Sequence, residues 1–240
     1  MSYGYEYSYP IAARAPANER AAFIRMTYGH LAGAILAFVV LETVFVQALH
    51  VQEVRDAFAA ALMSSRFTWL ILIGAFIGVS WLANSWAMSS TSKGLQYLGL
   101  SLYVAFEAVI FLPLLYIAST YYPDAIPVAG IMTLAIFGGL TAAVFLTGRD
   151  FSFLGPILSI AGLLALGLIV AAILFGFGLG LFFCFAMVAL ASGYILYDTS
   201  NVLHRYRTDQ HVAAALALFA SVALLFYYIL RIVMMSSSRR

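Results

Sequence analysis

The sequence predicts an all-α, polytopic membrane protein in which seven transmembrane helices form one bundle. Hydrophobic residues occupy 64% of the 240 positions and charged residues only 9%, whereas roughly 25% of the residues in soluble domains are charged. Seven stretches are long and apolar enough to supply the ~20 residues that a spanning helix needs. Inside a bilayer the backbone polar groups must be paired within the protein, so these stretches are expected to be helices.

Short polar or glycine-containing turns separate the seven predicted spans. Residues 1–26 contain no apolar run of the secretory-signal type, and we expect them to form a flexible cytoplasmic tail. The transmembrane domain is expected over residues 27–234, followed by a short polar tail, 235–240. Residues 50–66 mix charges with an apolar face and are interpreted as an interfacial helix or loop. The predicted spans are about 27–49, 67–87, 97–118, 127–147, 153–175, 179–203 and 212–234.

The distribution of Lys and Arg over the loops favours a cytoplasmic N-terminus, because cytoplasmic loops carry the excess of these residues. A cytoplasmic N-terminus places Arg55 and Arg66 outside, and seven crossings then put the C-terminal tail outside as well. The inner side would hold Arg14, Arg20, Arg25, Lys93, Arg149, Arg205 and Arg207. We expect an integral protein of the bacterial inner membrane.

Three carboxylates, Glu42, Glu107 and Asp198, lie well inside predicted spans, and no Lys or Arg lies deep enough to pair with them. At ~1.5 Å per residue, Glu107 is expected about 15 Å and Asp198 about 8 Å from the inner membrane surface. Glu42 is expected in the outer third. Glu107 and Asp198 are therefore predicted to share an inner cavity, with Glu42 separate from them.

The energetics allow such a carboxylate to exist in either protonation state. Inserting a charged Asp at a helix centre costs ~3 kcal/mol, and neutralising an Asp at pH 7 costs about 4 kcal/mol. These similar costs suit a pH sensor or a cation site. Helical spacing places Tyr194 and Asn201 on the face of Asp198, and Tyr103 one turn before Glu107. The alternative is a protonated carboxylate that only bonds to a neighbouring helix.

Other chemistries find little support in the sequence. The histidines, which a zinc site or a Ser/His protease would need, are scattered near helix ends, at His30, His50, His204 and His211. The last span has no carboxylate to complete an aspartyl-protease pair. The net charge of +2 and the scattered basic residues do not suggest nucleic acid as a partner. We expect no enzymatic activity and no cofactor other than a transiently bound cation.

Two stretches resemble the Bax inhibitor-1 (BAX-inhibitor-motif) membrane family. The turn at 149–155, RDFSFLG, is similar to that family's signature between its fourth and fifth helices. The segment 194–198, YILYD, followed by Asn201 and His204, is similar to its sixth-helix motif. The resemblance implies a seven-helix bundle around a central last helix. It also implies a pH-sensitive calcium leak, linked in eukaryotic members to resistance to cell death.

By the same resemblance, Asp198 matches the first aspartate of the family's paired pH sensor. The second aspartate falls near Ser221, and a latching arginine of some bacterial members falls near Ser90, so neither is present here. The leading hypothesis is a pH-sensitive calcium or cation leak with Asp198, Glu107, Tyr194, Asn201 and Ser221 as its ion- and pH-sensing residues. The alternative is a non-conducting protein that modulates a membrane protease, translocon or cell-death partner.

Overall fold

The computed structural model describes residues 9–63, 65–89 and 92–237, and within them the chain is helical. Seven helices, all except the short α2, are long and apolar enough to cross a membrane, which confirms the predicted all-α membrane fold. A 3₁₀-helix, η1 (Ala12–Arg14), precedes eight α-helices: α1 (Ala17–Ala48), α2 (Gln52–Met63), α3 (Arg66–Ala87), α4 (Lys93–Tyr121), α5 (Ala125–Thr147), α6 (Leu154–Phe175), α7 (Leu181–His204) and α8 (His211–Ser237).

Local sequence signals explain several helix ends. Ser65 and Ser92 are N-caps, and their side-chain oxygens accept hydrogen bonds from the backbone N–H groups of Phe67 and Leu95. Gly148 and Gly176 end α5 and α6 with φ angles of 59° and 75°, a left-handed conformation that favours glycine. These signals fix the turns between consecutive spans.

The first span begins earlier than predicted, at Ala17 instead of about Thr27. The added residues include alanines, which favour helix, and Glu19, whose charge complements the helix dipole in the first turn. Hydropathy detects only the apolar part of such a helix, so this polar first part was assigned to the tail.

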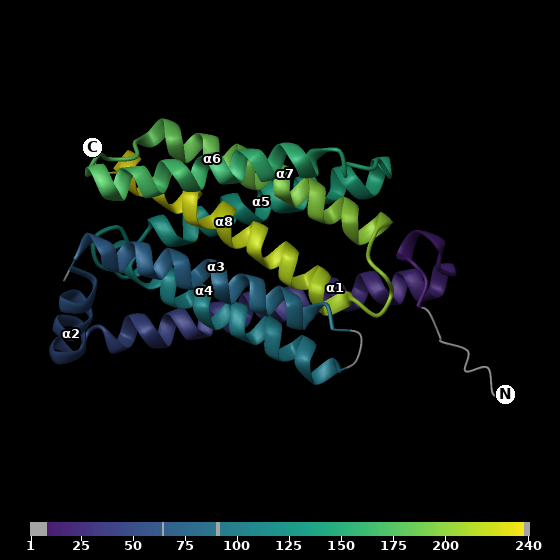
Figure 1. Ribbon diagram of the computed structural model, residues 1–240, viewed down its shortest axis with the longest axis horizontal. Coiled ribbons are helices and arrows are strands. Elements are labelled where there is room, and N and C mark those ends of the chain that lie inside the picture. Colours follow the sequence, from purple (N-terminus) through teal and green to yellow (C-terminus); the bar gives the residue numbers. More distant parts are fainter. Residues whose placement is uncertain (1–8, 64, 90–91, 238–240) are drawn as a thin grey trace.

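Helix α8 occupies the centre of the bundle. In its most apolar 18-residue stretch 72% of the residues are buried, against at most 50% in any other span. Figure 1 shows α8 running between a layer formed by α6 and α7 and a layer formed by α3 and α4. It contacts α1, α3, α4, α5 and α7. Most of α8, including the buried Ser221, therefore faces other helices instead of lipid.

The segment before α1 is held against the α7–α8 loop. The N–H of Ala12 donates to the carbonyl of Tyr206 at 2.9 Å, and the N–H of Thr208 donates to the carbonyl of Pro10 at 3.1 Å. Ala12 is fully buried. This part of the predicted flexible tail is thus fixed by backbone hydrogen bonds, which side-chain composition does not reveal.

Candidate functional site

Asp198 and Ser221 form a buried pair that joins α7 to the central helix. The hydroxyl of Ser221 donates to Oδ2 of Asp198 at 2.5 Å. Both residues are less than 10% exposed. The position that the resemblance puts opposite Asp198 is therefore its hydrogen-bond partner, with a hydroxyl in place of a second carboxylate.

Glu107 lies on the neighbouring helix α4 and is also buried. Its Oε2 atom has no hydrogen-bond partner among the described residues. The Tyr103 side chain, one turn earlier, interacts electrostatically with both Glu107 and Asp198. Tyr103 therefore lies near both carboxylates, which make no hydrogen bond to each other in the described structure.

Tyr194 and Asn201 do not bond to Asp198. The Tyr194 hydroxyl donates instead to the carbonyl of Leu158 on α6, at 2.9 Å. Gly162 makes room for this contact, since a Cβ there would lie 2.8 Å from the Tyr194 oxygen. Asn201 is buried, and its Oδ1 has no partner among the described residues. Helical spacing placed these residues near Asp198 correctly but could not show where their side chains bond.

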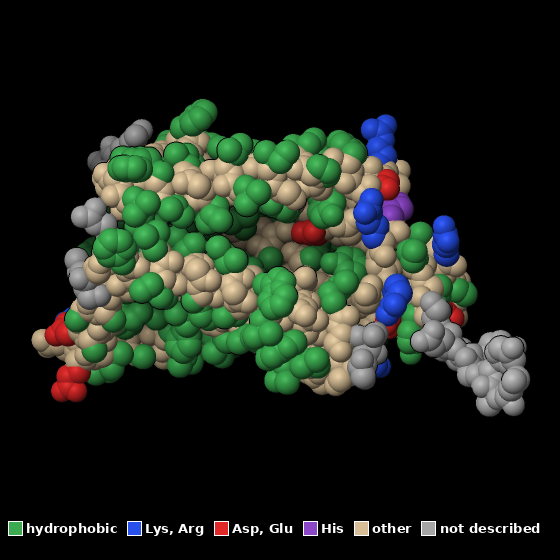
Figure 2. Space-filling model, in the orientation of Figure 1, with side chains coloured by type: hydrophobic (Ala, Val, Ile, Leu, Met, Phe, Trp, Pro, Cys, Tyr) green, Lys and Arg blue, Asp and Glu red, His purple; other side chains and the backbone are tan. Residues whose placement is uncertain are grey.

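A cavity of about 530 Å³ lies beside this pair, with walls from α3, α4, α6, α7 and α8. Figure 2 shows it as a hollow on the apolar flank of the bundle, with an acidic side chain visible inside. Glu107, Tyr194 and Ser221 line it, and it extends along α8 to Arg231. Asp198 is not among the lining residues. Of the two carboxylates that were predicted to share a cavity, Glu107 lines this one, and Asp198 is hydrogen-bonded to another lining residue, Ser221.

Glu42 is not separate from the other carboxylates, contrary to the prediction. It is buried on α1, neither of its oxygens has a partner among the described residues, and it lies close enough to Glu107 for their charges to interact. The ring of His30 stacks on Tyr97, which sets α1 against α4. Glu42 follows His30 by twelve residues and Glu107 follows Tyr97 by ten, so both reach a similar depth. The prediction failed because it measured depth from each span's own predicted boundary.

The turn between α5 and α6 is hydrogen-bonded to α7 at Ser200, two residues after Asp198. The N–H of Phe151 donates to the hydroxyl of Ser200 at 2.8 Å, and this hydroxyl donates to Asp150 at 3.2 Å. The N–H of Ser152 also donates to Asp150, which lowers the pKa of that carboxyl below its ordinary value. The two stretches that carry the family resemblance thus contact each other directly.

This cluster contains the residue types of a serine hydrolase in a different order. In a catalytic triad the histidine lies between serine and aspartate. Here Ser200 lies next to Asp150, and Nδ1 of His204 lies 3.0 Å from the backbone carbonyl of Ser200. The arrangement suits a structural clip that holds α7, and we call Asp150, Phe151 and Ser200 the turn clip.

Removing the Ser200 hydroxyl should destabilise the fold measurably. In Ser200→Ala, the half-buried N–H of Phe151 loses its partner, and the Asp150 carboxylate keeps only the hydrogen bond from the N–H of Ser152. We expect the free energy of unfolding to fall by about 1–2 kcal/mol, measured by equilibrium unfolding in mixed micelles. Ser159→Ala is the control, because that exposed hydroxyl bonds only to the carbonyl of Gly155 within its own helix. Equal stability of the two variants would contradict a fastening role for Ser200.

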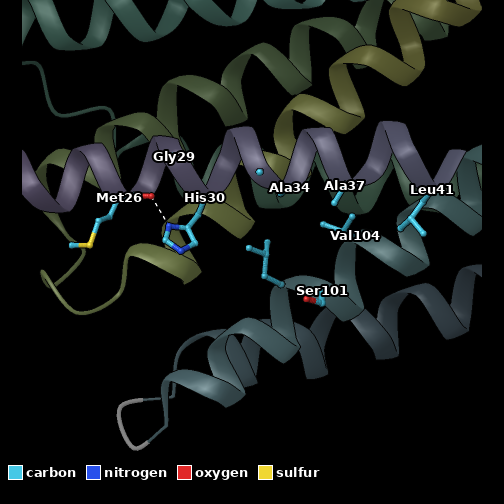
Figure 3. A pocket seen from close by; sticks show the side chains of 10 residues that line it. Met26, Gly29, His30, Ala34, Ala37, Leu41, Ser101 and Val104 are labelled. Carbon is cyan, nitrogen blue, oxygen red and sulfur yellow. Dashed lines mark hydrogen bonds between the residues drawn. The ribbon is translucent and has the colours of Figure 1, made fainter. Parts of the chain in front are cut away.

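A second hollow, of about 450 Å³, lies between α1 and α4, and Asp198 is not among its lining residues (Figure 3). Gly29, Gly33 and Ala37 form one wall. His30 is beside it, with Nδ1 2.7 Å from the carbonyl of Met26. It contains no carboxylate among its lining residues, so it does not extend the acidic site. The position of the expected latch, Ser90, lies outside the described residues.

Comparison with known proteins shows which family this chain is similar to. A protein-family model described as "Inhibitor of apoptosis-promoting Bax1" matches residues 20–239. The chain is 38% identical to the BI1-like protein of Arabidopsis thaliana, over 42% of each chain. It is 31% identical to Bax inhibitor 1 of Schizosaccharomyces pombe, over 68% of this chain and 61% of that protein. An uncharacterised protein of Pseudomonas aeruginosa is 28% identical over 68% of this chain and 72% of its own length. The matched region covers less than half of the Arabidopsis protein, so the similarity does not show that the two proteins share an activity.

Proposed function

This chain belongs to the Bax inhibitor-1 family of membrane proteins, and from that premise we propose that it is a pH-sensitive leak for Ca²⁺ and other cations. Asp198 is the sensor or ion ligand in this proposal, and Glu107 is its acidic partner. The observation that carries it is the Asp198–Ser221 hydrogen bond, which joins α7 to the central helix beside a cavity that Glu107 lines.

The chemistry of the site supports a weak and transient cation site. Hard cations such as Ca²⁺ take 6–8 oxygen ligands. Glu107, Ser221 and Tyr194 line the cavity, and Ser221 is hydrogen-bonded to Asp198. Within the described residues, three of the four carboxylate oxygens of Glu42 and Glu107 lack a hydrogen-bond partner. Such groups favour the entry of a proton or a cation.

The Asp198–Ser221 bond also suggests the direction of the pH response. An ionised carboxylate is the stronger acceptor, because its hydrogen bond is charge-assisted. Protonation of Asp198 would weaken the bond that holds α7 on α8. We therefore expect cation flux to rise as the pH falls.

The test is Ca²⁺ flux into proteoliposomes that contain only this protein, at acid and at neutral pH. The proposal predicts flux above that of empty liposomes and a larger flux at acid pH. Absence of flux at every pH would contradict it, and would favour a non-conducting protein that acts on a membrane partner. Co-purification with such a partner would then be the next measurement.

We also propose that the protein lies in a bacterial inner membrane and that its N-terminus is in the cytoplasm. This orientation is supported by the Lys and Arg side chains, which gather in Figure 2 at the end of the bundle where α1 begins. A thiol-labelling reagent that cannot cross membranes checks this orientation, using Ser152→Cys in a Cys184→Ala background. Labelling of Ser152→Cys in intact cells would contradict it.

A further inference from the structure

The large cavity contains a cation that the leak proposal does not use. Arg231 lies on α8 at the end of the cavity remote from Asp198, and no carboxylate of the described residues pairs with it. An unpaired guanidinium beside apolar walls is costly unless an anion or water reaches it. Trp69 and Tyr228 line the cavity together with Arg231. Such aromatic residues are typical of the membrane–water interface.

The rest of the cavity is elongated and apolar. Ser221 and Arg231 both line it and are ten positions apart on α8, so it follows that helix for about 15 Å at ~1.5 Å per residue. Between these ends the walls are built from side chains such as Leu72, Phe76, Leu166 and Leu190. Its volume of about 530 Å³ is within the range of small-molecule pockets, ~300–1,000 Å³.

The hollow opens on the side of the bundle. In Figure 2 it lies on the apolar flank, between the layer of α6 and α7 and the layer of α3 and α4. A molecule dissolved in the bilayer can therefore enter without crossing water. A ligand for this shape needs an anionic group at one end and an apolar body.

We propose that the cavity binds a single-chain anionic amphiphile, with its headgroup on Arg231 and its alkyl chain between α3, α6 and α8. The headgroup chemistry is a carboxylate or a phosphate, either of which a guanidinium binds by charge-assisted hydrogen bonds. The chain would reach toward Glu107 and Ser221 and cover them from the bilayer. Binding does not depend on ion conduction, so it can be measured whether or not the protein conducts.

Trp69 provides a direct probe, because it lines the cavity whereas Trp81 is 74% exposed on the outer surface. The protein has three tryptophans. A variant that keeps only Trp69 and a matched variant that keeps only Trp81 are placed in nanodiscs and titrated with brominated dodecanoate, whose bromines quench fluorescence on contact. We expect saturable quenching of Trp69, and only the gradual quenching of bilayer partition for Trp81.

The charge requirement is tested with ligands and with variants of the Trp69-only protein. The methyl ester of the probe and brominated dodecylamine should quench without saturation, and brominated dodecyl phosphate should behave like the carboxylate. Arg231→Gln should weaken carboxylate binding about tenfold, whereas Arg231→Lys should retain part of it. Arg205→Gln removes an exposed arginine at the opposite end of the bundle and should bind like the parent. Ala165→Phe, which fills the cavity from α6, should abolish saturation while Arg231 is retained.

Three results would overturn the proposal. One is equal quenching behaviour of Trp69 and Trp81, which would indicate partition into the bilayer alone. Another is tight binding of the ester or the amine. The third is unchanged affinity of a folded Arg231→Gln variant, which would show that the arginine only reaches the membrane surface.

Discussion

Replacement of Asp198 by asparagine is expected to abolish the pH response of cation flux. Asparagine has nearly the same shape and retains an oxygen that can accept the hydrogen bond from Ser221. It cannot ionise, so the variant removes the charge while it keeps the packing. One titrating group changes its ionised-to-neutral ratio about tenfold per pH unit. The variant should therefore show the same Ca²⁺ flux at acid and at neutral pH, whereas the parent protein should show more flux at acid pH.

The flux that remains in Asp198→Asn identifies the role of the aspartate. Substantial flux at both pH values would indicate a sensor, because conduction then does not need the charge. Loss of flux at both pH values would indicate an ion ligand. Asp124→Asn is the matched control, since Asp124 is exposed before α5, makes no capping hydrogen bond there and is not among the cavity-lining residues. A complete pH response in Asp198→Asn would contradict the assignment of Asp198.

The membrane architecture could be predicted well because it depends on local properties of the sequence. Apolar length and turn residues located every span, and the structure moves most boundaries by only a few residues. The start of α1 was missed because the first part of that helix is polar and its stability comes from tertiary contact. The fixed segment at Ala12 was missed for a related reason, since its bonds use only backbone atoms.

The site was less predictable because it depends on contacts between helices. Spacing along α7 placed Asp198 on a polar face with Tyr194 and Asn201, but it could not show that the Tyr194 hydroxyl bonds to α6. Depth counting separated Glu42 from Glu107, although the register of α1 on α4 brings them together. Arg231 falls in the last turn of the predicted span 212–234, and the sequence did not show that it lines a cavity. The register between two helices depends on contacts between residues far apart in the chain, so no simple pattern in one sequence predicts it.

The close contacts of glycines between helices were equally hard to predict from the sequence. One of them gives the largest stability effect that we expect. Glycines in membrane helices are typical of close helix contacts, but among Gly29, Gly33, Gly74, Gly78, Gly138, Gly139, Gly162 and Gly167 only Gly162 has another residue within 4 Å of where a Cβ would be. The tightest approach is at Gly99 on α4. A Cβ there would lie 2.5 Å from the carbonyl oxygen of Ala83 and 2.8 Å from the backbone nitrogen of Ala87, both on α3. Backbone atoms cannot rotate away as a side chain can, so the two helices would have to separate.

Gly99→Val should therefore lower the free energy of unfolding by about 3 kcal/mol, at the upper end of typical overpacking costs. Valine has a somewhat better intrinsic helix propensity than glycine, so a loss of stability would arise from helix packing and not from helix formation. Gly78→Val on α3 is the control, because nothing lies within 4 Å of its Cβ position, and we expect a change within about 0.5 kcal/mol. Equilibrium unfolding in mixed micelles measures both. If Gly99→Val were as stable as Gly78→Val, α3 and α4 would not pack backbone to backbone at this point. The α3 and α4 walls of the cavity would then need a different register.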